Sequence, residues 1–196
     1  ARRERHGHSK PQLRAEHGVS MLVTTFDGGN KDSFLFDTGV TVDGVLHNMD
    51  VLEVKGNELH AVVLSHGHTD HTRGLLGFIK RYGRPRVPIV LHPDAYLKRK
   101  NVQPDGHESE HIPPSRRDLE AEDIEIIEER GPTMLIGGHA LVTGQIPRTT
   151  PFENAESGRF TTHGRPTVAA TASTESSCTT IVFGCGTSKR SKSSAW

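Results

Sequence analysis

The sequence predicts an α/β fold, because continuous apolar runs of strand length alternate with a run of helical periodicity. Residues 59–64 and 87–91 are short, unbroken apolar runs, which is typical of strands buried on both faces of a sheet. Between them, residues 75–79 place apolar side chains at helical spacing. The chain has 196 residues, the usual length of one domain, so we expect this alternation to form a single core.

The segment before these strands has its own local patterns. Residues 19–26 and 33–36 are apolar and β-branched runs joined by the turn-forming residues 27–30, and together they predict a β-hairpin. Residues 45–52 have helical spacing, with Asp43 as the expected N-cap.

The segment after them predicts further elements of both kinds. Residues 93–100 predict a short helix with proline at its start. Residues 124–127 and 134–142 predict two more strands, the second of them interrupted by Gly137 and Gly138.

The chain divides into three parts by composition. Residues 1–12 are polar and charged without a period, and we expect a flexible arm there. Residues 13–153 carry the periodic runs and form the predicted domain, with a Pro-, Gly- and charge-rich excursion at residues 101–117. Residues 154–196 are rich in Ser, Thr, Gly and Lys, and they predict a poorly ordered tail.

Charge and hydropathy exclude several classes of protein. The 24 basic and 24 acidic side chains cancel, which removes the electrostatic footprint of a nucleic-acid-binding protein. The basic run at residues 98–100 is expected on a solvated face. No apolar run reaches the 18 or so residues of a membrane-spanning helix, and the charged start lacks the apolar core of a signal peptide. We therefore expect no membrane partner and a cytoplasmic location, with both Cys as free thiols.

One loop concentrates the chemistry, in a chain that has 13 His. The predicted strand at residues 59–64 is followed directly by Ser-His-Gly-His-Thr-Asp-His. In an extended segment, residues two apart project to the same side, so His66 and His68 can bind one metal ion while Asp70 and His71 bind a second. Ligand sites of layered α/β proteins form at the carboxyl ends of strands, which is where this loop lies.

The motif also resembles that of a known family. His-x-His-x-Asp-His after an apolar strand, with the upstream Phe-Leu-Phe-Asp-Thr-Gly of residues 34–39, resembles the metallo-β-lactamase superfamily. Residues 16–20, 91–95 and 143–148 are similar to a subgroup of dihydropterin ribofuranosylaminobenzene phosphate synthase-like hydrolases. The resemblance implies a four-layer αββα sandwich that binds one or two metal ions, usually Zn²⁺, with iron or manganese as alternatives. It also implies that Asp37 steadies the metal loop, although a role as a helix or turn cap stays open.

The chain departs from this family in two respects. Only the first half of the sandwich is clearly present, so we expect an incomplete fold that self-associates through an exposed sheet face. In the subgroup, a His after a Gly-Cys-Gly or Gly-Cys-Ser segment supplies a further metal ligand, and this chain has Thr187 there. The third ligand of the first ion is therefore left open among these downstream residues: His92, His107, His111, His139, His163 and Cys185.

The function implied is metal-dependent hydrolysis. A metal-bound hydroxide would attack an ester, lactone, amide or phosphoester of a small-molecule substrate, with Asp70 orienting the nucleophile. Three alternatives stay open, namely an inactive or truncated metal-binding fragment, an iron-dependent oxidoreductase of the same superfamily, and a non-catalytic partner-binding module.

Two further motif matches lack their structural context. Residues 107–111 match the His-Glu-x-x-His pattern of zinc proteases, but prolines and glycine on both sides exclude the helix that this site requires. Residues 184–189 have a lysine at the wrong spacing for a phosphate-binding loop.

Overall fold

The computed structural model describes residues 11–27, 29–82, 87–102, 105–135, 138–146, 159–162 and 181–183. The predicted arm at residues 1–12 lies outside this part of the chain, apart from its last two residues. Among the described residues, no helix is long and apolar enough to cross a membrane.

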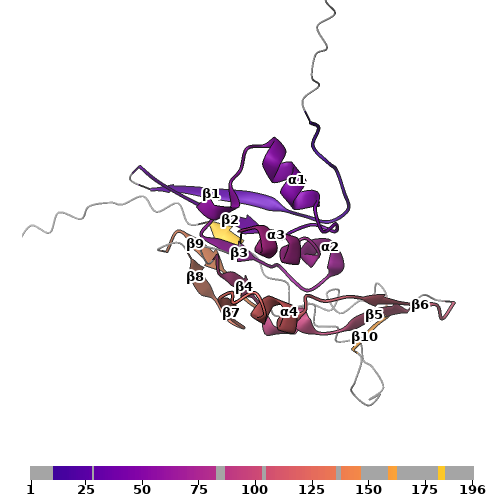
Figure 1. The fold of residues 1–196 in the computed structure, drawn as a ribbon. Helices are drawn as coiled ribbons and strands as arrows, with labels where there is room; N and C mark the ends of the chain where they lie inside the picture. Colours follow the sequence, from indigo (N-terminus) through magenta and orange to yellow (C-terminus); the bar gives the residue numbers. More distant parts are fainter. Residues whose placement is uncertain are drawn as a thin grey trace, which may run out of the picture.

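A five-stranded mixed sheet forms the centre of the fold, in the order β1-β2-β3-β4-β7 (Figure 1). The predicted hairpin is confirmed as antiparallel β1 (Met21–Asp27) and β2 (Asn30–Phe36). The next three strands all run parallel to β2, and these are β3 (Ala61–Val63), β4 (Ile89–Leu91) and β7 (Ile126–Glu128). Parallel strands end at one edge of the sheet, so the loops that follow β2, β3 and β4 meet there.

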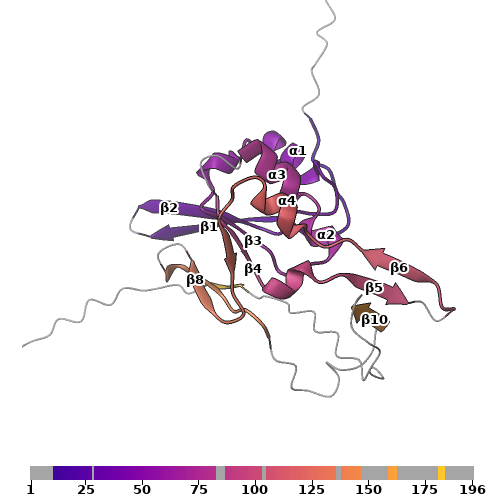
Figure 2. The ribbon, with the colours of Figure 1, turned by 60° about the horizontal axis from the view of Figure 1, so that its bottom comes forward.

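Helices connect the parallel strands and cover one face of this sheet. Figure 2 shows three of them, α1 (Gly44–Val51), α3 (Leu75–Tyr82) and α4 (Arg116–Glu120), gathered on the same side. The short helix α2 (Thr69–Thr72) lies in the motif loop, and the 3₁₀ turn η1 (Gly56–Glu58) precedes β3. The helices predicted at residues 45–52 and 75–79 are confirmed by α1 and α3.

The two faces of the sheet are built from alternate residues of the same strands. Val62 of β3 and Ile89 of β4 pack with the helices, whereas their neighbours Val63 and Val90 belong to a second apolar cluster on the opposite face. All four side chains are at most 1% exposed. A central strand can be continuously apolar, as the sequence predicted, because successive side chains point to opposite faces.

A smaller sheet covers the second face. It has the order β11-β9-β8 and consists of β8 (Thr133–Leu135), β9 (Ala140–Val142) and β11 (Ile181–Phe183). Leu135, Ala140 and Val142 are buried in the apolar cluster that this sheet shares with the central one. The interrupted strand predicted at residues 134–142 is thus a hairpin of two strands, and the second layer of strands in the predicted sandwich is present in part.

The helix predicted at residues 93–100 is wrong beyond its first turn. A 3₁₀ turn, η2 (Pro93–Tyr96), ends where Leu97 adopts an extended conformation, and residues 99–102 form strand β5 (Arg99–Val102). This strand pairs on one side with β6 (Glu108–His111) and on the other with β10 (Arg159–Thr162). Backbone pairing on both edges outweighs the weak local preference of a short polar segment.

Two other expectations concern a helix cap and the C-terminal segment. Asp43 stands at the N-cap position of α1 but makes no capping hydrogen bond, and its carboxylate pairs with Arg14 at 2.7 Å. Residues 154–196, predicted as a poorly ordered tail, include the short strands β10 and β11; the rest of that segment lies outside the described residues, and the expected tail stays a prediction.

Candidate metal centre

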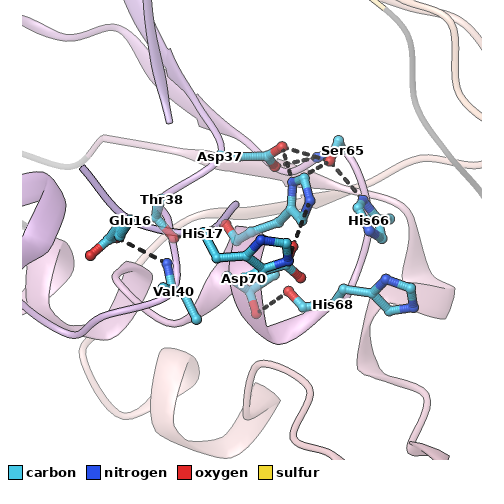
Figure 3. Close-up of polar contacts among 11 residues, drawn as sticks. Glu16, His17, Asp37, Thr38, Val40, Ser65, His66, His68 and Asp70 are labelled. Atoms are coloured by element: carbon cyan, nitrogen blue, oxygen red, sulfur yellow. Dashed lines mark hydrogen bonds and ion pairs between the residues drawn. The ribbon is translucent and has the colours of Figure 1, made fainter. Parts of the chain in front are cut away.

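The loops after β2 and β3 meet at the carboxyl edge of the central sheet, where a buried carboxylate joins them. Asp37 follows β2, is 1% exposed, and has a left-handed backbone conformation with φ of 59°. Its backbone N–H donates to the Val63 carbonyl at 2.9 Å, so the strand's pairing with β3 continues to this residue. The turn aims the carboxylate of Asp37 into the loop that carries the predicted metal ligands (Figure 3).

Asp37 accepts hydrogen bonds from both ends of that loop. Its Oδ1 accepts from the Ser65 backbone N–H at 2.7 Å, and its Oδ2 accepts from the Ser65 hydroxyl at 2.6 Å. The same Oδ2 accepts from His71 Nδ1 at 2.8 Å. Asp37 therefore steadies the loop, as expected, and does not cap a helix.

These bonds determine which ring nitrogens of two histidines face outward. The Ser65 hydroxyl has one proton and donates it to Asp37, so it accepts a hydrogen bond from His66 Nδ1, which lies 2.8 Å away. In their neutral forms, the rings of His66 and His71 then both carry N–H at Nδ1 and a lone pair at Nε2. An oriented Nε2 lone pair on a ring held by a carboxylate or hydroxyl is the usual arrangement of a metal-binding histidine.

The three histidine rings of the motif lie side by side. The ring centroids of His66 and His68 are 4.5 Å apart, and those of His66 and His71 are 4.2 Å apart. His71 Nε2 lies 3.4 Å from Asp70 Oδ2. The loop thus brings together all four residues that the sequence predicted as metal ligands.

Burial keeps two of these rings neutral. It lowers the pKa of His66 to about 3, with the charges of His71 and His68 as smaller causes, and it lowers the pKa of His68 to about 4. The pKa of His71 is raised, chiefly by its hydrogen bond to Asp37. Neutral imidazole is the form that binds a metal ion.

A buried arginine stands beside the histidines. Arg99 of β5 is 7% exposed, and its guanidinium donates to the carbonyls of Leu97 and Asp94 at 3.2 and 2.9 Å. Its charge contributes to the lowered pKa of His66 and of His68. The expectation that residues 98–100 form a solvated basic run is therefore wrong for Arg99, since strand β5 turns this side chain inward.

The downstream histidines have different surroundings. His111 of β6 stacks on His68, with ring centroids 5.0 Å apart and planes 22° apart, so the excursion returns to the motif. His92 is buried, and its Nδ1 accepts a hydrogen bond from the Asp94 backbone N–H at the start of η2. His107 is exposed, and His139 lies at the start of the turn into β9. Two other candidates, His163 and Cys185, lie outside the described residues, as does Thr187.

One residue close to the motif, His17, is not among the site residues that the sequence predicted. The Nε2 atom of His17 lies 3.4 Å from Asp70 Oδ2, and Figure 3 shows its ring over that carboxylate. The sequence feature that could have pointed to His17 is the Glu-His-Gly segment that the chain shares with the subgroup. This segment alone does not predict a contact with a residue 53 positions further along the chain.

The four predicted ligands have donor atoms that suit a transition-metal ion, but they lie in two pairs. Imidazole nitrogen and carboxylate oxygen are ordinary Zn²⁺ ligands, and the rings of His66 and His68 are neutral. Within the described ranges, no three His, Cys, Asp or Glu side chains already stand so as to enclose an ion. The residues are therefore of the right kind and lie together, and each pair needs a further ligand.

Comparison with known proteins agrees with this geometry. The sequence model of the Metallo-beta-lactamase superfamily matches residues 13–149. A 7,8-dihydropterin-6-methyl-4-(beta-D-ribofuranosyl)-aminobenzene-5'-phosphate synthase of Methanocaldococcus jannaschii is 35% identical over 82 residues, which are 42% of this chain and 28% of the relative. An uncharacterized protein of the same archaeon is 30% identical over 146 residues, 72% of this chain and 51% of the relative.

Among solved structures, the fold is similar to that of Tm1679, described as a metal-dependent hydrolase of the beta-lactamase superfamily. The TM-score is 0.58 at 23% identity, and the match covers 89% of this chain and 57% of Tm1679. The chain thus spans between about a quarter and about three fifths of the length of these proteins. The family match covers most of the predicted domain, and the chain belongs to the metallo-β-lactamase superfamily.

Proposed function

We propose that the chain is a zinc-dependent hydrolase whose ions are held by His66 with His68 and by Asp70 with His71. The observation that carries this proposal is the hydrogen-bond network of Asp37 and Ser65. It fixes the rings of His66 and His71 with Nε2 outward, which is the usual arrangement of metal-binding histidines.

Each residue of the network has a task that follows from its contacts. When bound, Zn²⁺ supplies a water of lowered pKa and polarises the carbonyl or phosphoryl oxygen of a substrate. Asp70 lies between His17 and His71 and is 24% exposed at its side chain, so its carboxylate can orient an incoming water. Arg99 supplies fixed positive charge beside His66 and His68, which favours a substrate that is anionic or develops negative charge.

The similar proteins support the class of reaction, hydrolysis, but they do not identify the substrate. The description of Tm1679 as a metal-dependent hydrolase matches the proposal, and the archaeal relative of known name is called a synthase. Because the chain covers 28% of that relative, its substrate does not transfer. We therefore propose hydrolysis of an ester, lactone, amide or phosphoester of a small molecule, in a reducing compartment such as the cytoplasm.

Metal content and activity of the full chain test this proposal together. Elemental analysis should find zinc at one or two ions per chain, and a chelator should lower the melting temperature. A His66→Ala, His68→Ala double variant should lose the metal and any activity on aryl ester, lactone and phosphodiester substrates. His60→Ala is the control, because His60 pairs with an aspartate outside the motif.

Three results would overturn the proposal. Zinc well below one ion per chain, with no effect of the chelator, would favour an inactive fragment. Iron in place of zinc, with oxygen consumption, would favour an oxidoreductase of the same superfamily. Activity that survives loss of His68 would show that the histidine cluster is structural.

A further inference from the structure

The segment before the domain's first strand lies across the loop that holds Asp70 and His71. We propose that His17 in this segment is a metal ligand, and that its Nε2 completes the half of the centre formed by Asp70 and His71. The inference rests on the proposed function, because it concerns the same metal centre.

The segment is anchored next to His17 by a carboxylate clamp. Glu16 Oε1 accepts hydrogen bonds from the backbone N–H groups of Val40 and Thr41 at 3.1 and 3.3 Å. Its Oε2 accepts from the Thr41 hydroxyl at 2.5 Å. The Gly39 N–H in addition donates to the carbonyl of Val19 at 2.9 Å. These bonds tie both sides of His17 to the loop that follows Asp37.

On the other side of His17, a glycine permits close contact with the motif. Gly18 has φ of +96°, a conformation that favours glycine, and a Cβ at this position would overlap the carbonyl oxygen of Asp70. The backbone next to His17 therefore lies directly against the backbone of Asp70. The two anchors, Glu16 and Gly18, leave the ring of His17 over the Asp70 carboxylate (Figure 3).

The distances at Asp70 are those of neighbouring ligands. Asp70 Oδ2 lies 3.4 Å from His17 Nε2 and 3.4 Å from His71 Nε2. Around a tetrahedral Zn²⁺ with ligand bonds of about 2.0–2.2 Å, two ligand atoms are about 3.4 Å apart. Hydrogen bonds from nitrogen to oxygen are shorter, at about 2.7–3.2 Å. Each nitrogen is thus at a co-ligand distance from the carboxylate oxygen, although the three side chains enclose an ion only after the exposed ring of His17 turns.

A second His–Asp pair, His60 with Asp32, has the same separation but has no second histidine beside it among the described residues. His60 Nε2 lies 3.4 Å from Asp32 Oδ1, and within the described part of the chain no second histidine pairs with this carboxylate. At Asp70 a second histidine, itself oriented by Asp37, shares the carboxylate oxygen. The side chain of His17 is 88% exposed, so its ring has room to turn the remaining way around an entering ion.

Metal titration of the full chain tests this role. The metal-free protein is titrated with Co²⁺ and Zn²⁺ against a chromophoric chelator, and the visible spectrum of the Co²⁺ form is recorded. His17→Ala and His17→Gln should both weaken binding of one ion at least about tenfold and reduce the Co²⁺ absorption that reports nitrogen ligands, while leaving the other ion bound. His60→Ala is the matched control and should behave as the unaltered chain does.

Two variants separate a ligand from a residue that acts through Asp70. Glutamine can donate a hydrogen bond to the carboxylate but offers no imidazole nitrogen, so recovery of affinity and spectrum in His17→Gln would overturn the ligand role. Glu16→Gln weakens the clamp without touching His17, and it should lower the affinity for the same ion, by less than His17→Ala does.

The outcomes distinguish this inference from the proposed function. If the unaltered chain binds metal and His17→Ala binds it equally well with an unchanged spectrum, the inference is wrong and the hydrolase proposal stands. If the unaltered chain binds neither Co²⁺ nor Zn²⁺, both are wrong.

Discussion

His71 donates a hydrogen bond from Nδ1 to a carboxylate, that of Asp37, which is only 1% exposed. The carboxylate lies one strand away from the histidine, and it holds the ring through the nitrogen that faces the protein. The opposite nitrogen faces Asp70. The orientation of the proposed ligand thus depends on a residue that is almost entirely buried.

We expect Asp37→Asn to weaken metal binding about 10–100-fold, because an amide cannot accept from Ser65 and His71 as the carboxylate does. Asparagine tolerates the left-handed backbone conformation of this position, so the change leaves the turn in place. In the metal-free protein, the pKa of His71 should fall towards its ordinary value, which NMR titration measures. Asp50→Asn, which breaks an exposed pair with Arg81, is the control. Unchanged affinity in Asp37→Asn would contradict the role given to this network.

Gly67→Ala should destabilise the loop that carries the motif. A Cβ at Gly67 would overlap the carbonyl oxygen of Ala95, which belongs to η2 and is buried. The resulting shift should cost about 1–3 kcal/mol in the free energy of unfolding and displace the flanking histidines. Gly131→Ala, where a Cβ would meet nothing within 4 Å, should change stability by less than about 0.5 kcal/mol. Urea denaturation compares the two variants, and equal stability would contradict the close packing of the loop on η2.

Tyr96→Phe should make the free energy of unfolding less sensitive to high pH. Burial raises the pKa of Tyr96 to about 12 from 10.0, with Glu128 as a smaller cause. The unfolded chain therefore releases this proton first as the pH rises from 10 to 12, and the folded state loses stability over that window. The hydroxyl is buried with no hydrogen-bond partner among the described residues, so at neutral pH the variant should be within about 1 kcal/mol of the original chain.

The test is a comparison of unfolding curves near neutral pH and at about pH 11. The variant should be the more stable protein only at the higher pH, and Tyr82→Phe serves as the control for a phenol on the neighbouring helix. A pH dependence that is the same in Tyr96→Phe and in the original chain would contradict the burial of this hydroxyl.

Self-association of the chain stays a prediction, and the exposed apolar side chains of β1 indicate where two copies would meet. This strand stands at the end of the sheet order, and Met21, Leu22 and Phe26 on it are 48%, 47% and 76% exposed. An end strand with exposed apolar side chains favours pairing with a second copy. Phe26→Thr keeps the β-propensity of the strand and should shift sedimentation velocity profiles towards the monomer. A chain that sediments as a monomer before any substitution would show the prediction to be wrong.

The central sheet and the contents of the loop could be predicted from the sequence, because both depend on local pattern. Unbroken apolar runs indicate β3 and β4, since a strand covered on both faces has no polar side, and Val62 and Val63 show this directly. The ligand types and their order are also local information. Their assembly at one edge followed from the parallel course of the strands.

What the sequence could not predict depends on contacts between distant segments. Strand β5 is polar, and its conformation is determined by backbone pairing with β6 and β10, so neither its extension nor the burial of Arg99 has a local signal. The stacking of His111 on His68 and the approach of His17 to Asp70 join residues 43 and 53 positions apart. No spacing rule relates such residues before the fold is known.

Substitutions in the parallel strands and substitutions in the loops that follow them have different consequences. Substitutions within β2, β3 and β4 affect packing on two faces at once, so selection for folding alone constrains these positions. The loops that follow them also hold buried side chains, such as Asp37, Thr38, Ser65 and His92, but their exposed positions meet fewer packing limits. A lineage with this architecture can therefore exchange its substrate by changing three short loops while its interior stays the same, and a conserved interior is no evidence that two such proteins share a reaction.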